Sequence, residues 1–493
     1  MTISVYMLTA AILLLISIFS SKLASRYGIP ALLIFLGVGM IFGSDGLNWV
    51  YFDDYQLAQS LGIIALIYIL FSGGLDTQWK KVKPIIRPGI ALSTLGVLIS
   101  AFVVGGFAYW LLGFSLLEGV LLGAIVSSTD AAAVFSVLRS NAMGFKYRLK
   151  ELMEFESGTN DPIAIFLTIG IIQLLTLPEF SGLSLLFLFL RQIIIGLAAG
   201  YLFGKVITWI TNRINLEYDG LYPVLTISFV PLIYAVTDLL GGSGFLAVYL
   251  AGLVLGNSNF IHRRSLINFF DGVGWLMQIA MFLCLGLLVF PKQIMTIYVS
   301  GFLIALVLIL VARPASVFIS LMFSRFNARS KLMVSWTGLR GAVPIIMATF
   351  PLVAGVENAE MIFSIVFFVV VTSVIIQGPT IPWVARRLSV DSPIPPKTKF
   401  PIEFEPSIDT KSALKEIVIN SKDPVVGKTV VDLNFPDKAL IVIINREGSF
   451  IVPRGTTEMR PNDKLLILAE KELMTQIREI LKGEKTQHSK INN

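Results

Sequence analysis

Long apolar segments constrain the fold of this chain more than any other feature of its sequence. About thirteen runs before residue 388 approach the length of roughly 20 residues that a helix needs to cross a bilayer. They cover residues 5–21, 30–46, 57–75, 88–111, 117–137, 149–177, 184–211, 221–239, 243–257, 268–289, 296–323, 333–354 and 360–386. Only 14% of the 493 residues are charged, whereas soluble domains carry about 25%. The sequence therefore predicts that residues 1–388 form an α-helical polytopic membrane domain.

Basic residues fall in every second loop and predict the orientation of the chain. One set of loops contains Lys22, Arg26, Lys80, Lys81, Lys83, Arg87, Arg139, Lys146, Arg148, Lys150, Arg213, Arg263, Arg264, Arg325, Arg329, Lys331, Arg386 and Arg387. The alternate loops carry Asp53, Asp54, Glu179 and Glu357, with Lys292 as an exception. By the positive-inside rule, the N-terminus is expected outside a prokaryotic cytoplasmic membrane and the C-terminal region inside the cell.

Two carboxylates are expected near the middle of the bilayer. Asp130 lies in the fifth span and Asp161 in the sixth, roughly 20 Å from the outer end and roughly 18 Å from the inner end of their spans. Carboxylates are costly in a bilayer core and mark functional sites there. Because consecutive spans are antiparallel, the two acids are expected to share one site. The alternatives are that they belong to buried ion pairs, or that Asp130 caps a broken half-helix.

Neutral oxygen donors lie beside these acids. Ser157 is four residues before Asp161 and on the same helix face, and Thr129 and Asn160 add further oxygens. Such hard ligands suit Na⁺, K⁺ or Li⁺. Burial and a neighbouring carboxylate favour the protonated form of an aspartate. A monovalent cation and a proton are therefore expected to compete at Asp161, and competition at an alternately exposed site gives exchange.

Two arginines within the predicted spans need partners, because arginine keeps its charge. Arg313 is expected to pair with Glu156, as a structural ion pair, since Glu156 points away from the face of Asp161. Arg340 lies in a stretch with glycine and proline, residues 338–344, which predicts an interruption of the twelfth span. Interrupted helices build ion sites in transporters with inverted repeats. Residues 127–130 of the fifth span contain neither glycine nor proline to mark a matching interruption.

These residues together resemble the monovalent cation:proton antiporters, specifically the NhaP-like branch that also includes the animal sodium/proton exchangers. The resemblance covers residues 5–388 and rests on Thr129-Asp130, Glu156-Ser157, Asn160-Asp161, Arg313 and Gly338-Leu339-Arg340-Gly341. It implies a homodimer in the lipid membrane, with a core domain in which broken fifth and twelfth spans cross. It also implies that Asp161 carries the cation and the proton, surrounded by Thr129, Asp130, Ser157 and Asn160, with Arg340 compensating the broken helices and Glu156 paired with Arg313.

The Asn160-Asp161 pair, in place of two acids, resembles the electroneutral members and implies one cation exchanged for one proton. The chain departs from many relatives at Ser72, where they carry an acid before two glycines, and at Ala131, where they often carry proline. Both K⁺ and Na⁺ remain open as the cation.

The sequence after the last span predicts a small α+β cytoplasmic domain. Residues 389–410 are rich in proline and charge and predict a linker. Residues 411–485 form the domain, and residues 486–493 a disordered tail. Within the domain, strands are expected at 416–419, 439–444 and 464–468, and an amphipathic helix at 471–482.

This domain resembles the C-terminal half of RCK regulators, also called TrkA-C. The likeness rests on Pro424-Val425-Val426-Gly427-Lys428-Thr429, Pro453-Arg454-Gly455 and Arg460-Pro461-Asn462-Asp463. It implies gating by a ligand such as a nucleotide, and its association with potassium proteins favours K⁺. A passive assembly domain is the alternative.

Other classes of protein fit the sequence less well. The single Cys284 and the two histidines, His262 and His488, argue against an internal disulfide, a thiolate metal cluster and a zinc or iron site. No Gly-rich dinucleotide-binding half precedes the C-terminal domain, so NAD is not expected there, and no other cofactor is expected. A potassium channel needs a carbonyl-lined filter such as Thr-Val-Gly-Tyr-Gly, which the sequence lacks, and no nucleophile–base pair suggests an enzyme. The basic residues do not form one stripe, so nucleic acid is not an expected partner. A carrier of organic solutes would have a similar composition, and only the pair Asp130 and Asp161 argues against it.

Overall fold

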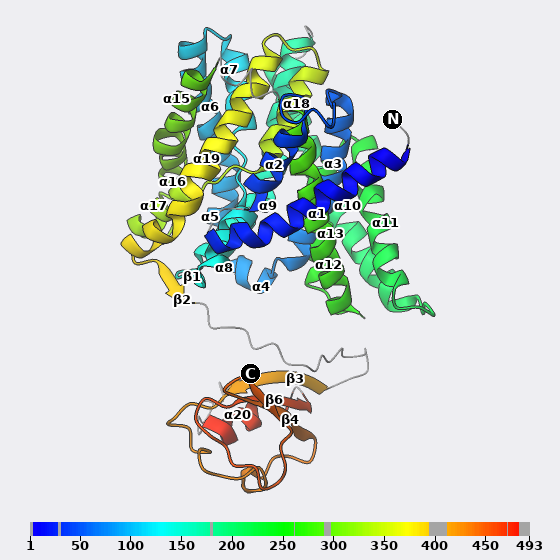
Figure 1. Cartoon of the computed structure of the whole chain (residues 1–493), viewed down its shortest axis with the longest axis vertical. Helices are drawn as coiled ribbons and strands as arrows, with labels where there is room; N and C mark the ends of the chain where they lie inside the picture. The colour runs from blue at the N-terminus through cyan, green and yellow to red at the C-terminus, as the bar shows by residue number, and fades with distance from the viewer. Residues whose placement is uncertain are drawn as a thin grey trace. The chain divides into compact units, whose positions relative to one another are not determined.

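The computed structural model describes residues 3–27, 31–177, 181–260, 262–289, 297–393, 412–470 and 472–482. The chain divides into two compact units (Figure 1). The larger one comprises Met1–Asn259 and Ser265–Pro395, and the smaller one contains Pro396–Asn493. Each unit has its own core and is described by itself.

The larger unit is helical. Its α-helices are α1 (Ile3–Tyr27), α2 (Ala31–Phe42), α3 (Tyr55–Asp76), α4 (Trp79–Val82), α5 (Ile86–Ala91), α6 (Val97–Leu112), α7 (Leu116–Ile125), α8 (Ala131–Ser140), α9 (Leu149–Thr176), α10 (Gly182–Arg213), α11 (Leu221–Leu239), α12 (Gly244–Gly256), α13 (Arg263–Leu287), α15 (Tyr298–Val307), α16 (Arg313–Ser320), α17 (Ala328–Trp336), α18 (Ala342–Val353) and α19 (Ala359–Arg387). Short turns of other helix types join α4 to α5, α5 to α6 and α15 to α16.

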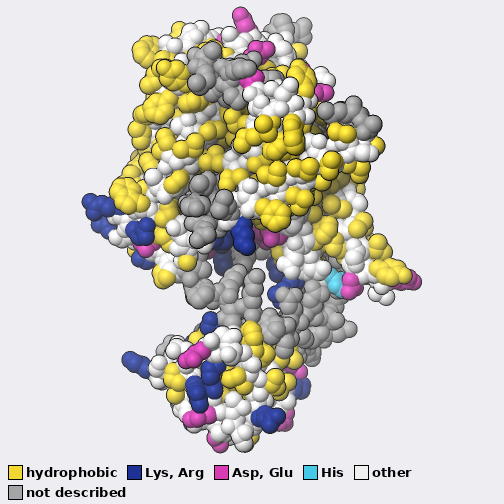
Figure 2. All heavy atoms as spheres, in the orientation of Figure 1, with side chains coloured by type: hydrophobic (Ala, Val, Ile, Leu, Met, Phe, Trp, Pro, Cys, Tyr) yellow, Lys and Arg dark blue, Asp and Glu magenta, His cyan; other side chains and the backbone are white. Residues whose placement is uncertain are grey.

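The thirteen predicted passes are confirmed. Among the described residues, nine helical stretches are long and apolar enough to span a bilayer. The shorter helices α2 and α12, and the pairs α7–α8 and α17–α18, provide the remaining passes. The outer surface fits a lipid environment: hydrophobic side chains cover the flanks of this unit, while Lys and Arg gather at its lower end and acids mark its upper end (Figure 2).

The fifth and twelfth passes are both interrupted, as predicted for the fold. The fifth pass breaks between Ile125 and Ala131, and the twelfth between Trp336 and Ala342. Asp130 makes the first break possible without glycine or proline. Its carboxylate accepts the backbone N–H groups of Ala132 and Ala133, at 2.8 and 3.2 Å, which are otherwise unpaired in the first turn of α8.

Glycines let α3 and α12 approach closely beside these breaks. A Cβ atom at Gly74 would lie 2.3 Å from the carbonyl oxygen of Tyr249, and one at Gly252 would lie 2.4 Å from the carbonyl oxygen of Phe71. Small residues permit such contacts between membrane helices. The contact fixes Tyr249, whose ring lies directly over Gly158 of α9.

A short sheet ties the end of the last pass to the middle of the unit. Strand β1 (Met143–Phe145) follows α8, and it pairs antiparallel with β2 (Asp391–Pro393) after α19. The sequence placed residues 391–393 in the linker, where three residues carry too little pattern to reveal a strand. Residues 394–410 of the predicted linker and the predicted disordered tail, residues 486–493, lie outside the described residues.

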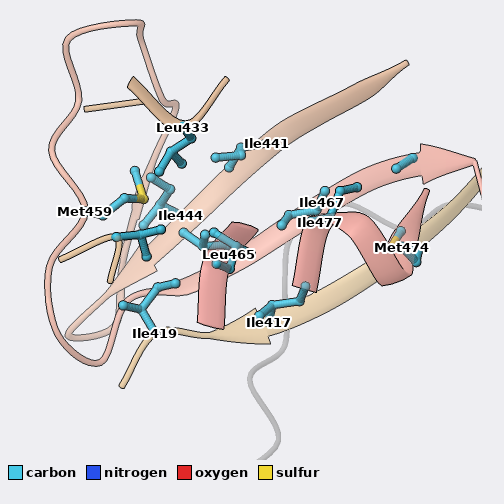
Figure 3. Packing of buried hydrophobic residues seen from close by; sticks show 13 residues of the cluster. Ile417, Ile419, Leu433, Ile441, Ile444, Met459, Leu465, Ile467, Met474 and Ile477 are labelled. Atoms are coloured by element: carbon cyan, nitrogen blue, oxygen red, sulfur yellow. The ribbon is translucent and has the colours of Figure 1, made fainter. Parts of the chain in front are cut away.

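The smaller unit is an α+β domain with its own core (Figure 3). Its elements are β3 (Ser412–Val418), β4 (Ala439–Arg446), β5 (Ser449–Ile451), β6 (Lys464–Glu470) and α20 (Met474–Lys482). The antiparallel sheet has the order β3-β6-β4-β5. Alternate residues of β6, such as Leu465 and Ile467, pack against Ile477 of α20. The three predicted strands and the closing helix are thus present, with shifted ends.

Candidate functional site

The breaks of the fifth and twelfth passes contact each other directly. The backbone N–H of Asp130 donates to the carbonyl oxygen of Leu339 over 2.7 Å. The guanidinium of Arg340 donates to the carbonyl oxygens of Ser127 and Ser128, at 2.6 and 2.8 Å. These carbonyls follow the C-terminal end of α7 and have no helical partner, and a cation there opposes the partial negative charge of a helix end. Arg340 is fully buried and links the two breaks.

Asp161 faces this crossing from the middle of α9. Its carboxylate is buried and accepts a hydrogen bond from the hydroxyl of Ser128. Asp161 and Asp130 both line a cavity of about 270 Å³. They differ in their partners, because the Asp130 carboxylate caps α8 whereas Asp161 forms no ion pair with a described basic residue.

Three neutral side chains connect α9 to the broken fifth pass. The hydroxyl of Ser157 donates to the carbonyl oxygen of Thr129 over 2.9 Å and accepts the N–H of Ala131 over 3.2 Å. The side-chain amide of Asn160 donates to the Thr129 hydroxyl over 2.7 Å. The amide oxygen of Asn160 is buried and has no hydrogen-bond partner among the described residues. The structure thus brings Thr129, Asp130, Ser157, Asn160 and Asp161 together.

Glu156 and Arg313 form a separate pair. The guanidinium contacts both carboxylate oxygens, at 2.6 and 3.0 Å, and both side chains are buried. Such a bidentate pair is strong and directional. Neither residue lines the cavity that holds Asp161. Glu156 is therefore held by its arginine, away from the cavity.

The cavity also has lining residues that the sequence did not single out. Ser128 was visible beside Thr129-Asp130, but its contact with Asp161 depends on the break. Tyr249 is buried and lines the cavity, and it lies in a short apolar span with nothing in the sequence to mark it. Its position results from the close packing of α3 and α12.

Further acidic residues line the same cavity. Asp76 at the end of α3, Glu154 in α9 and Asp271 in α13 line it together with Arg139. Glu154 pairs with Lys150 at 3.5 Å. Acids outnumber bases along this lining, so the cavity attracts cations. Chemically, the carboxylate of Asp161 with the oxygens of Thr129 and Ser157, which line the same cavity, is a hard donor set suited to an alkali cation. Asn160 is not among the lining residues.

Comparison with known proteins identifies both units. Residues 10–387 match the family described as "Sodium/hydrogen exchanger, transmembrane", and residues 414–482 match the TrkA-C domain. These matches confirm the two resemblances of the sequence.

Relatives match over nearly the whole chain. The K(+)/H(+) antiporter NhaP of Alkalimonas amylolytica is 39% identical over 472 residues, covering 95% of this chain and 82% of the relative. The K(+)/H(+) antiporter NhaP2 of Shewanella baltica is 38% identical over 476 residues, covering 95% and 81%. The sodium proton antiporter MjNhaP1 from Methanocaldococcus jannaschii, solved at pH 8, superposes with a TM-score of 0.69 at 25% identity, over 78% of this chain and 99% of that one.

The named relatives are transporters, not enzymes, and the crossed, interrupted helices around Asp161 lie within the matched region. The chain is a multi-pass cation/proton antiporter and belongs to the sodium/hydrogen exchanger family.

Proposed function

We propose that this antiporter exchanges K⁺ for H⁺ across a prokaryotic cytoplasmic membrane, one for one, at Asp161. The observation that carries the proposal is that the three acids Glu156, Asp130 and Asp161 have different partners. Glu156 is paired with Arg313, and Asp130 is used as a helix cap. Asp130 and Asp161 both line the cavity, but among the described residues Asp161 has only the Ser128 hydroxyl as its hydrogen-bond partner. Its carboxylate is therefore available to a cation or a proton.

A single available carboxylate supports electroneutral exchange. When Asp161 binds one alkali cation, the site is neutral, and when it binds one proton, the site is neutral again. Asn160, which takes the place of a second acid, holds the hydroxyl of Thr129 over 2.7 Å without adding charge. Movement of the loaded site across the membrane therefore carries no net charge in either direction.

The names of the relatives and the presence of the TrkA-C domain support K⁺ as the transported cation. The two relatives with 38–39% identity are named K(+)/H(+) antiporters, and TrkA-C domains accompany potassium proteins. Sodium is the competing cation, and the name of the solved archaeal structure supports it.

The proposed orientation follows the basic loops. The acidic cavity runs from Asp161 toward Asp76 and Glu154, which lie at helix ends on the side of the basic loops. We place this side, with the TrkA-C unit, in the cytoplasm and the N-terminus outside. The cavity then opens Asp161 to the cytoplasm. In the proposed homodimer, each subunit has its own site.

The TrkA-C unit is proposed to regulate transport through a bound ligand such as a nucleotide. Its α+β core is small, and a passive role in assembly is the alternative. The alternative from another class of protein is a ligand-gated K⁺ channel.

The decisive experiment measures the recovery of a pH-sensitive dye in everted vesicles after K⁺ or Na⁺ is added. The wild type is expected to respond to K⁺, Asp161→Asn to give no response, and the matched surface variant Glu357→Gln to respond like the wild type. Glu357 is exposed and lies in a loop far from Asp161 in the sequence.

Proteoliposomes separate the remaining alternatives. Electroneutral exchange is expected to proceed at the same rate with and without an imposed membrane potential. Potassium flux without proton movement would instead indicate a channel. A response to Na⁺ alone would assign the cation to sodium.

A further inference from the structure

A second hollow lies apart from the cation cavity. It has a volume of about 750 Å³ and shares no lining residue with the cavity of Asp161. Three segments form it: residues 83–88 at the start of the fourth pass, residues 147–148 before α9, and residues 323–327 between α16 and α17 together with Ser330 of α17. It is thus built where three passes of the antiporter begin or end.

Its lining is strongly basic. Lys83, Arg87, Arg148 and Arg325 line it, and no acidic residue does. All four are exposed, and among the described residues none of them forms an ion pair or a side-chain hydrogen bond. Four unpaired positive charges around one hollow repel one another, and an anion relieves this repulsion. Arginine in particular binds phosphate through two parallel hydrogen bonds.

The level of the hollow in the membrane indicates the kind of anion. The span Tyr298–Ser320 ends three residues before Phe323, and the span Trp79–Leu112 includes the basic residues of the fourth pass. Phe323 and Tyr147, which line the hollow, are 95% and 59% exposed. Aromatic side chains at the end of a span lie at the level of the lipid head groups, and basic pockets between membrane helices bind anionic head groups there.

The backbone conformation at Tyr147 and Arg148 indicates that the hollow has a fixed shape. Tyr147 and Arg148 are consecutive and both have positive φ angles, 57° and 58°. Residues other than glycine rarely adopt this conformation, and its persistence indicates that the surrounding structure holds the turn in place. Arg148 directly precedes α9, the helix that carries Asp161.

We propose that this hollow binds the phosphate of an anionic phospholipid head group, in the leaflet on the side of the basic loops. The arginines and Lys83 contact the phosphate, while Phe323 and Tyr147 contact the glycerol and the upper acyl chains. The bound lipid holds together the starts of the fourth and sixth passes and the loop before the interrupted twelfth pass.

The experiment compares two triple variants of the purified full-length protein. The test variant is Arg87→Gln/Arg148→Gln/Arg325→Gln, and the matched control is Lys80→Gln/Lys81→Gln/Arg329→Gln. The control residues are exposed on the same side and carry the same total charge, but they do not line the hollow. Binding of phosphatidylglycerol, relative to phosphatidylcholine, is measured by native mass spectrometry and by the thermal midpoint.

Phosphatidylglycerol is expected to bind the wild type and the control alike, and to bind the test variant at least roughly tenfold more weakly. Equal weakening in both triple variants would overturn the proposal, because binding would then reflect general surface charge. Glycerol 3-phosphate that displaces the lipid at equal concentration would also overturn it, in favour of a soluble phosphate.

Two single variants separate the loss of lipid binding from a loss of folding and from a loss of transport. The single variant Arg325→Gln is in a loop and is expected to elute as wild type while binding the lipid more weakly. Asp161→Asn is expected to bind the lipid as wild type does, so a failure of the transport proposal leaves this test valid.

Discussion

The N–H of Asp130 and the carbonyl oxygen of Leu339 form a hydrogen bond of 2.7 Å, which joins the interruption of the fifth pass to that of the twelfth. Neither group has a helical partner, because each lies in a break. Each break therefore supplies a hydrogen-bond partner for the backbone of the other. The position of Asp130 thus depends on residues more than 200 positions away in the chain. Small changes on the twelfth pass are expected to reach the cation cavity by this route.

Gly341→Ala tests this coupling. A Cβ atom at Gly341 would lie 2.5 Å from a carboxylate oxygen of Asp130, so the cap of α8 must shift. Such overpacking costs about 1–3 kcal/mol, and we expect transport to fall by at least roughly tenfold in the dye assay. Gly106→Ala is the control, because a Cβ atom there meets nothing within 4 Å. Equal transport in both variants would contradict the coupling.

Transport and stability are expected to depend on the helix-capping oxygen of the Asp130 side chain more than on its negative charge. Asparagine caps helices as well as aspartate does, whereas alanine loses about 1 kcal/mol. Asp130→Asn should therefore keep most of the transport rate and the thermal midpoint, and Asp130→Ala should lower both. If asparagine abolishes transport while the midpoint is unchanged, the charge of Asp130 takes part in cation binding.

The sequence predicts the passes and most of the site residues, because bilayer thickness sets the length of each span and intramembrane acids are rare. The break in the twelfth pass was visible through Gly338 and Gly341. The break in the fifth pass was not visible from glycine or proline, since a side-chain cap at Asp130 stabilises it. Tyr249 could not be predicted either, because contacts between distant helices place it in the cavity.

The Glu156–Arg313 pair should affect stability and transport differently from Asp161. In Glu156→Gln, the buried arginine loses its partner, which costs about 3–5 kcal/mol. We expect a lower thermal midpoint in detergent, with the apparent K⁺ affinity of the remaining folded protein unchanged, because Glu156 does not line the cavity. Asp161→Asn should show the reverse: a retained midpoint and no transport. A change in K⁺ affinity in folded Glu156→Gln would place this acid in the transport site.

Two truncations distinguish the short β1–β2 sheet from the TrkA-C unit. A chain that ends at Arg387 loses β2, whereas one that ends at Pro395 keeps it. Strand β2 pairs with β1 between α8 and α9, and the N–H of Lys146 donates to the carbonyl oxygen of Val390 over 2.9 Å. The sheet therefore supports the turn that leads from the broken fifth pass into the helix of Asp161.

We expect the chain ending at Arg387 to unfold at a lower temperature than the chain ending at Pro395, and to transport K⁺ more slowly in the dye assay. Both lack the TrkA-C unit, so any regulation by that unit affects them equally. The wild type compared with the longer truncation then isolates the effect of the TrkA-C unit alone. Identical midpoints and rates in the two truncations would show that β2 contributes nothing to the site, and that the contacts of α9 with the crossing suffice to hold Asp161 in place.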